Sequence, residues 1–195
     1  MAEFKRLLAQ LCCDEKQEEE LLSYASACGN DGADGLVFVD NAKTDEEHEF
    51  HNGLIRKMAR AIDIPIFAGG RVKRLEDVKK YLYAGAKGVF LDASVEENVD
   101  MIKEAADRFG SEKIFIRLND AAQTKRIPEY AQLGASMAFL GENVLPEAAE
   151  VIRTMEEQMH YYVMSPSCDA GKLAGELKAE PAAGVVFVNE KPDHG

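Results

Sequence analysis

The chain has 195 residues, of which 46% are hydrophobic, so it is long enough and apolar enough to build one packed domain. Its net charge is −12, with 35 acidic against 23 basic residues. The sequence has no lysine- or arginine-rich run of the kind that binds a nucleic-acid backbone. No apolar stretch approaches the roughly 20 residues of a membrane-spanning helix. These features exclude nucleic-acid and membrane partners.

The N-terminus lacks the apolar core of a signal peptide. The four cysteines, Cys12, Cys13, Cys28 and Cys168, show no C-x-x-C spacing and no disulfide framework. We therefore expect reduced thiols in a cytoplasmic protein.

Short β-branched or aromatic runs alternate with charged amphipathic stretches along the chain, which predicts repeated βα units. Thr44-x-x-Glu47 has the spacing of a helix capping box. The predicted elements, in chain order, are strand 6–11, helix 16–28, strand 36–39, helix 44–61, strand 64–68, helix 74–84, strand 88–91, helix 95–109, strand 113–118, helix 123–133, strand 136–140, helix 146–158, strand 161–164, helix 169–179 and strand 184–188.

Eight strands and seven helices predict an α/β fold: a compact (βα)₈ TIM-type barrel with short loops and the last helix missing, as a single domain over residues 1–195. The alternative is an open doubly wound sheet, but Leu11-Cys12-Cys13-Asp14 is not its Gly-rich nucleotide turn. Residues 189–195 are too short for an eighth helix. We expect the outer faces of the first and last strands to be covered by residues 1–4, a second copy or downstream sequence.

Parallel βα folds place their chemistry at the carboxyl ends of the strands. Two strand units carry motifs that are specific enough to compare with known families: Gly-Ala-Asp-Gly-Leu-Val-Phe-Val-Asp at 32–40 and Ile-Asp-Ile-Pro-Ile-x-x-Gly-Gly at 62–70. They resemble the histidine-biosynthesis barrels, the cyclase subunit of imidazole glycerol phosphate synthase and the ribotide isomerase. Residues 44–49 and 77–85 resemble, more narrowly, a barrel-like module ahead of bifunctional phosphoribosyl-AMP cyclohydrolase/phosphoribosyl-ATP pyrophosphatase proteins.

The resemblance implies two catalytic aspartates, at the ends of the first and fifth strands. Cys12 and Asn119 stand at these positions, and neither an asparagine nor an unactivated thiol is a competent proton carrier at neutral pH. The fallback acid/base candidates are Asp14, Asp40 and Asp120.

The resemblance also implies phosphate-binding turns after the third and fourth strands. Gly69, Gly70, Arg71 and Asp92 stand there and are the candidate ligand-binding residues. Arg71 could bind an anion, but we favour its pairing with Asp92 or Asp40. The glycine turns for a second phosphate are absent from the sequence after 164 and 188.

Glu47-His48-x-x-His51 places two imidazoles on one helix face. A metal site there lacks a nameable third ligand, so we favour a solvated acidic helix start and expect no metal and no cofactor.

These residues favour a catalytically degraded barrel that serves as the accessory N-terminal module of a histidine-pathway protein of the cyclohydrolase/pyrophosphatase type. Its expected partners are downstream catalytic domains or a homo-oligomer partner, and a phosphorylated small molecule. The alternatives are an active ribosyl-phosphate lyase or isomerase that uses the relocated aspartates, Asp92 included, and a non-catalytic phosphometabolite sensor. If the barrel is the accessory module, we expect the intact protein to be a histidine-biosynthesis hydrolase although this domain is inactive.

Overall fold

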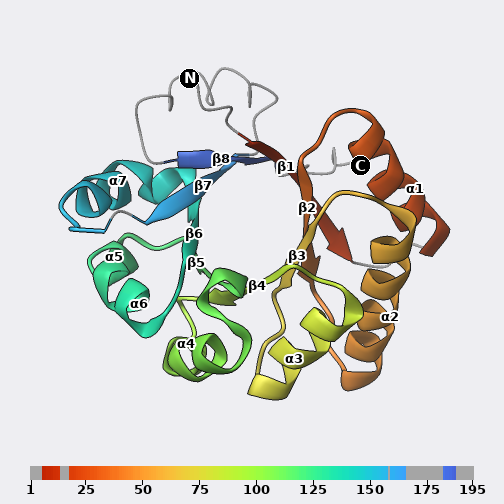
Figure 1. Ribbon diagram of the computed structural model, residues 1–195, viewed down its shortest axis with the longest axis horizontal. Coiled ribbons are helices and arrows are strands. Elements are labelled where there is room, and N and C mark those ends of the chain that lie inside the picture. The colour runs from red at the N-terminus through yellow and green to blue at the C-terminus, as the bar shows by residue number, and fades with distance from the viewer. Residues whose placement is uncertain (1–5, 14–17, 158, 166–181, 188–195) are drawn as a thin grey trace.

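The computed structural model describes residues 6–13, 18–157, 159–165 and 182–187. Eight parallel strands follow one another around a closed barrel, in which β1 pairs with both β2 and β8 (Figure 1). The strands are β1 (Arg6–Cys13), β2 (Gly35–Asp40), β3 (Ile66–Gly69), β4 (Gly88–Asp92), β5 (Ile114–Leu118), β6 (Met137–Gly141), β7 (His160–Ser165) and β8 (Ala182–Phe187). The predicted TIM-type barrel is therefore confirmed, and the open sheet is excluded.

The helices lie outside the ring of strands (Figure 1). They are α1 (Glu18–Asn30), α2 (Asp45–Ala61), α3 (Leu75–Ala84), α4 (Glu96–Phe109), α5 (Ala121–Thr124), α6 (Ile127–Leu133) and α7 (Leu145–Arg153), with short 3₁₀ turns η1 (Ser111–Lys113) and η2 (Glu142–Val144). At the start of α2, Thr44 Oγ1 accepts from the Glu47 N–H as the predicted capping box requires, but Glu47 Oε2 accepts from the Lys43 N–H, one residue before the cap, so only half of the box is formed.

Two predicted helices differ from the structure. The single helix expected over 123–133 is divided into α5 and α6, because Pro128 has no N–H to donate to the carbonyl four residues earlier. The helix expected over 146–158 ends at Arg153, where the Thr154 hydroxyl donates to the Val151 carbonyl. The predicted helix 169–179 lies outside the described residues.

The buried side chains form two layers. Those that face the helices make the larger core, which includes Leu36, Phe38, Ile116 and Leu118. Those that face the barrel axis include a cluster of aromatic rings: rings from β3 to β7 pack on one another with centroids 5.3–5.8 Å apart. These interior rings are Phe67, Phe90, Phe115, Phe139 and Tyr162.

Glycines on neighbouring strands leave the room that these rings occupy. A Cβ added to Gly88 would lie 2.8 Å from Phe115 and 3.1 Å from Phe67, and one added to Gly69 would lie 2.6 Å from the Phe90 ring. The interior is therefore filled by side chains, as in other barrels of this strand number.

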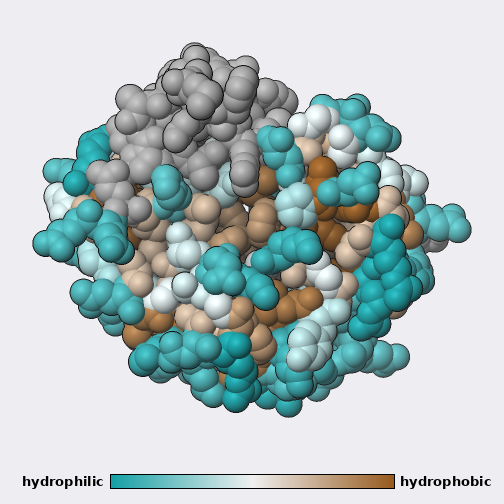
Figure 2. Space-filling model, viewed as in Figure 1, coloured by the Kyte–Doolittle hydropathy of each residue, from teal (hydrophilic) through white to brown (hydrophobic). Residues whose placement is uncertain are grey.

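The outer face of β1 was expected to be covered, and its apolar side chains are buried. Ala9 and Leu11 alternate with the inward-facing Leu8, and both are buried in the core that faces the helices. The outward side chains of β8 lie outside what the structure describes. Figure 2 shows hydrophilic residues around the rim of one face and hydrophobic residues toward its centre.

Candidate functional site

The strand ends predicted to carry function are brought to one end of the barrel by the parallel topology. Cys12 lies in the last part of β1, in register with Val39 of β2. Its side chain and the whole of Asp14 lie outside the described part of the structure. The geometry of the site therefore comes from the ends of β2 to β6.

Asp40, the last residue of β2, is directed toward the helices. It is only 1% exposed and its carboxylate accepts four hydrogen bonds from described residues. His48 and His51 of α2 approach it with Nδ1 atoms at 2.6 Å each, the Tyr81 hydroxyl of α3 donates at 2.7 Å, and the Ala42 N–H donates at 3.0 Å. A carboxylate only accepts, so both imidazoles carry their hydrogen on Nδ1.

These contacts determine the charge of Asp40. Burial raises the pKa of the Asp40 carboxyl, but the hydrogen bonds from His51, Tyr81, Ala42 and His48 outweigh it, so that the pKa lies below its ordinary value. Burial and then the Asp40 charge raise the pKa of the Tyr81 phenol. Asp40 is therefore ionised, and Tyr81 is a permanent donor at neutral pH.

His48 continues the network toward the start of α3. Its Nε2 lies 3.4 Å from Asp77 Oδ1 and 3.4 Å from Asn52 Nδ2. Asp77 uses its other oxygen to accept from the Lys73 and Arg74 N–H groups, which fixes the first turn of α3. Two carboxylates thus flank one imidazole, and the network joins β2, α2 and α3.

This cluster corrects the interpretation of Glu47-His48-x-x-His51 as a solvated helix start. His48 is 3% and His51 7% exposed, because both rings turn inward over Asp40 and the aromatic rings of Tyr81 and Phe38. In the described residues, no group of three or more His, Cys, Asp or Glu side chains is arranged to hold a metal ion. The cluster is a buried hydrogen-bond network that joins β2 to α2 and α3.

The turn after β3 has Gly70 at φ 109°, where a Cβ would lie 2.7 Å from the Asp40 carbonyl oxygen. The next residue, Arg71, extends to Asp45 at the start of α2, with Nη2 3.1 Å from Oδ1. Arg71 pairs with a carboxylate as expected, but the partner is Asp45 and neither Asp40 nor Asp92. The reason is the direction of Asp40, whose oxygens are already taken on the helix side.

Asp92 at the end of β4 is also engaged locally. Its Oδ1 accepts from the Ser94 N–H at 2.9 Å and from the Ser94 hydroxyl at 2.7 Å. Its backbone N–H donates to Asn98, whose side chain in turn donates to the Val72 carbonyl. Asp92 therefore holds the β4–α4 turn and its link to the β3–α3 loop.

The β5 end carries an amide followed by a capping carboxylate. Asp120 Oδ1 accepts from the Ala122 N–H at 2.9 Å and so caps α5. Asn119 lies over Gly141 of β6, since its Oδ1 would be 3.0 Å from a Cβ at that position. The Asn143 side chain donates to the Asn119 carbonyl at 2.8 Å.

One residue at this end escaped the sequence interpretation. Arg117 of β5 has its Cζ 6.0 Å from the centroid of the interior ring of Phe90, and its Nε is buried without a partner among the described residues. The signal that could have found it is the alternation of β5, which places residue 117 on the same face as Phe115.

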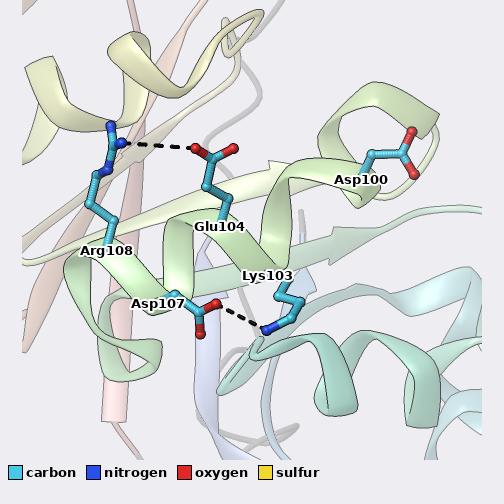
Figure 3. Close-up of a pocket in the computed structure, with 5 residues that line it drawn as sticks. All are labelled: Asp100, Lys103, Glu104, Asp107 and Arg108. Atoms are coloured by element: carbon cyan, nitrogen blue, oxygen red, sulfur yellow. Dashed lines mark hydrogen bonds and ion pairs between the residues drawn. The ribbon is translucent and has the colours of Figure 1, made fainter.

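A hollow of about 550 Å³ lies along the outer surface of α4 (Figure 3). Its lining residues are Asp100, Lys103, Glu104, Asp107 and Arg108. Lys103 pairs with Asp107 and Arg108 with Glu104, each four residues apart on the one helix. Such pairs are ordinary features of a solvated helix face. None of the helices that the structure describes is long and apolar enough to cross a membrane.

Comparison with known proteins identifies relatives of this barrel. The profile of the family described as "Histidine biosynthesis protein" matches residues 13–157. The imidazole glycerol phosphate synthase subunit HisF of Endomicrobium trichonymphae is 35% identical over 109 residues, which are 56% of this chain and 42% of the relative. The subunit HisF of Staphylococcus aureus (strain JH9) is 36% identical over 99 residues, 51% of this chain and 39% of the relative. The matches thus span about two fifths of the relatives' own length.

Proposed function

Because the chain belongs to the histidine biosynthesis protein family, we propose that it is a non-catalytic accessory barrel of a histidine-pathway protein. The similar proteins are named as subunits of a synthase, which is in keeping with a barrel that works as part of a larger assembly. The proposal has two parts: loss of the acid–base chemistry, and a role beside other catalytic domains.

The observation that carries the first part is the end of β5. An asparagine stands where the resemblance requires a catalytic aspartate, and a neutral amide neither accepts nor releases a proton at neutral pH. The neighbouring carboxylate, Asp120, accepts the Ala122 N–H as the cap of α5. Cys12, at the corresponding position of β1, adds a second position without a carboxylate.

The described fallback carboxylates have other partners. Asp40 is buried under α2 and α3, where four donors surround it, and Asp92 is bonded to Ser94. A general base must reach the proton that it removes, at about 3 Å or through one water. Asp40, at 1% exposure and on the helix side of its strand, does not meet this condition.

The second part rests on the two segments that resemble the cyclohydrolase/pyrophosphatase type of protein. Segment 44–49 contains His48 and segment 77–85 contains Asp77 and Tyr81. His48 and Tyr81 bond to Asp40, and Asp77 lies 3.4 Å from Nε2 of His48. The segments therefore share one structural purpose, the joining of β2 to α2 and α3, and we propose that the barrel inherited this tie from a module of that kind.

The first experiment measures cyclase and ribotide isomerase turnover by the purified chain. We expect rates at background for the wild type, since each general acid or base contributes about 10²–10⁴-fold. The double variant Cys12→Asp with Asn119→Asp should raise the rate above background, and Asn30→Asp, exposed at the end of α1, is the matched control. A robust wild-type rate that disappears in Asp14→Asn or Asp120→Asn would establish the relocated enzyme instead.

The second experiment tests the accessory role. The chain is mixed with phosphoribosyl-AMP cyclohydrolase/phosphoribosyl-ATP pyrophosphatase domains from the same organism, and the complex is sought by analytical ultracentrifugation together with the hydrolase rates. A stable complex, or a changed hydrolase rate, is expected. Sedimentation as separate species with unchanged rates contradicts the accessory role and leaves the loss of cyclase chemistry to be judged by the first experiment.

A further inference from the structure

Arg117 points into the barrel. On β5, Ile114, Ile116 and Leu118 belong to the core that faces the helices, while Phe115 belongs to the interior cluster. Because side chains alternate along a strand, residue 117 shares the interior face with Phe115. The 6.0 Å distance from the Arg117 guanidinium carbon to the interior ring of Phe90 agrees with this direction. The Arg117 guanidinium therefore lies at the carboxyl end of the barrel interior, next to the ring of Phe90.

Arg117 forms no ion pair with any of the residues that the structure describes. Its Nε is buried and makes no hydrogen bond. Asp92, its registered neighbour on β4, gives its Oδ1 to Ser94. An arginine stays protonated at any physiological pH, and a buried donor without an acceptor costs about 1–3 kcal/mol. A bound anion would accept this hydrogen bond and neutralise the charge.

The neighbouring strand end places further polar side chains at the same end of the barrel. Gly141 of β6 has no side chain, and a Cβ there would lie 3.0 Å from Asn119 Oδ1 and 2.5 Å from Asn143 Oδ1. The side chain of Asn119 therefore lies over the same interior face. An aspartate at 119 would supply a negative charge close to Arg117, whereas the asparagine that stands there adds a neutral amide that can both donate and accept.

We propose that Arg117, with Asn119, binds an oxyanion at the mouth of the barrel, that is, the phosphate or carboxylate group of a small molecule. The planar guanidinium presents parallel N–H donors that match the two oxygens of either group. Phe90 supports the guanidinium from below. This site is distinct from Gly69-Gly70-Arg71, because the Arg71 guanidinium is already paired with Asp45. It requires no turnover and stands whether or not the barrel is an accessory module.

The test titrates the full chain separately with inorganic phosphate, acetate and chloride at constant ionic strength, and follows the Arg117 Nε–H signal by ¹H–¹⁵N NMR. The signal is assigned by its loss in Arg117→Gln. We expect a saturable shift with phosphate or acetate that chloride does not reproduce, and the comparison of the two titrations tells which group the site prefers. Affinity for the anion, measured for the wild type and for Arg117→Gln by isothermal titration calorimetry, should fall at least about tenfold in the variant, the equivalent of one charge-assisted contact.

Two further variants make the outcome decisive. Arg71→Gln should bind the anion as the wild type does, and Asn119→Asp should weaken binding by adding like charge beside it. Thermal melting with and without anion is measured in parallel, so that an unfolded variant is recognised. An equal response to chloride, or an anion affinity that is the same in Arg117→Gln as in the wild type, would overturn the proposal. So would a wild type that no anion stabilises while Arg117→Gln melts lower, because Arg117 would then be paired within the chain.

Discussion

His48 Nδ1 lies 2.6 Å from Asp40 Oδ2, so the first turn of α2 is fixed to the last residue of β2 by a buried, charge-assisted hydrogen bond. This contact links the strand end to the helix that follows it, across the short loop 41–44. Through Nε2 of the same ring, the link extends to Asp77 of α3. The barrel mouth near β2 therefore owes its shape to a network on the helix side of the sheet.

We expect Asp40→Asn to lower the free energy of unfolding by about 3 kcal/mol, because it leaves two imidazoles and a phenol facing an amide in a buried place. Urea unfolding followed by circular dichroism measures this. Asp63→Asn, an exposed carboxyl before β3, is the control and should change stability little. Equal stability of the Asp40→Asn variant and the wild type would show that the network contributes nothing to folding.

The same carboxylate should make the free energy of unfolding fall at acid pH. The folded-state pKa of Asp40 lies below its ordinary value, so its stabilisation is complete above the unfolded value of about 3.9 and disappears as the pH falls through the folded pKa. The difference in unfolding free energy between the wild type and Asp40→Asn should therefore shrink as the pH is lowered below about 4. A difference that stays constant down to full acid unfolding would contradict the lowered pKa.

Tyr81→Phe removes one donor to Asp40 and leaves the ring in place. We expect a loss of about 1.5–3 kcal/mol, the range for a hydrogen bond to a charged group. Tyr83→Phe, on the same helix but 74% exposed, should be neutral. Burial and the Asp40 charge raise the Tyr81 pKa, so Tyr81 should not ionise in the folded protein at alkaline pH. Ultraviolet titration should therefore count equal numbers of ionising tyrosines in the folded wild type and the folded Tyr81→Phe variant. After unfolding, the variant should show one tyrosine fewer.

Gly70→Ala should destabilise the chain by about 1–3 kcal/mol, because φ is 109° and the new Cβ would meet the Asp40 carbonyl oxygen at 2.7 Å. Gly53→Ala is a matched control inside α2. Nothing lies within 4 Å of a Cβ there, so the variant should gain stability by up to about 1 kcal/mol from helix propensity. Thermal melts of both variants give the comparison, and changes of the same sign would refute this account of the β3–α3 turn.

The repeating βα pattern was sufficient to predict the barrel, because strand and helix periods are local properties of the sequence. Contacts between residues far apart in the sequence were harder to predict. Tyr81 reaches Asp40 over 41 positions, and no local period reports such a contact. The spacing of His48, His51 and Asn52 on one helix face was visible, but solvated and buried faces of that kind look alike until a carboxylate is known to lie beneath them.

Arg117 shows the opposite case, because a local rule is sufficient to place its side chain. A charged residue two positions from a buried phenylalanine was counted as part of a strand, whereas alternation alone already places it inside the barrel. Functional positions inside a barrel can therefore be sought by listing the polar residues that share the face of its interior rings.

Inside this barrel, the size of an interior ring and the size of the residue facing it on the next strand depend on each other. Position 88 is a glycine because the Phe115 ring lies 2.8 Å from where its Cβ would stand, so one volume is divided between two strands. In relatives, a side chain gained at 88 should accompany a smaller residue at 115, and the two positions should covary although they belong to different βα units. Sequence variation inside this barrel is then constrained in pairs, and mutagenesis of one interior position should be compensated most readily from the strand beside it.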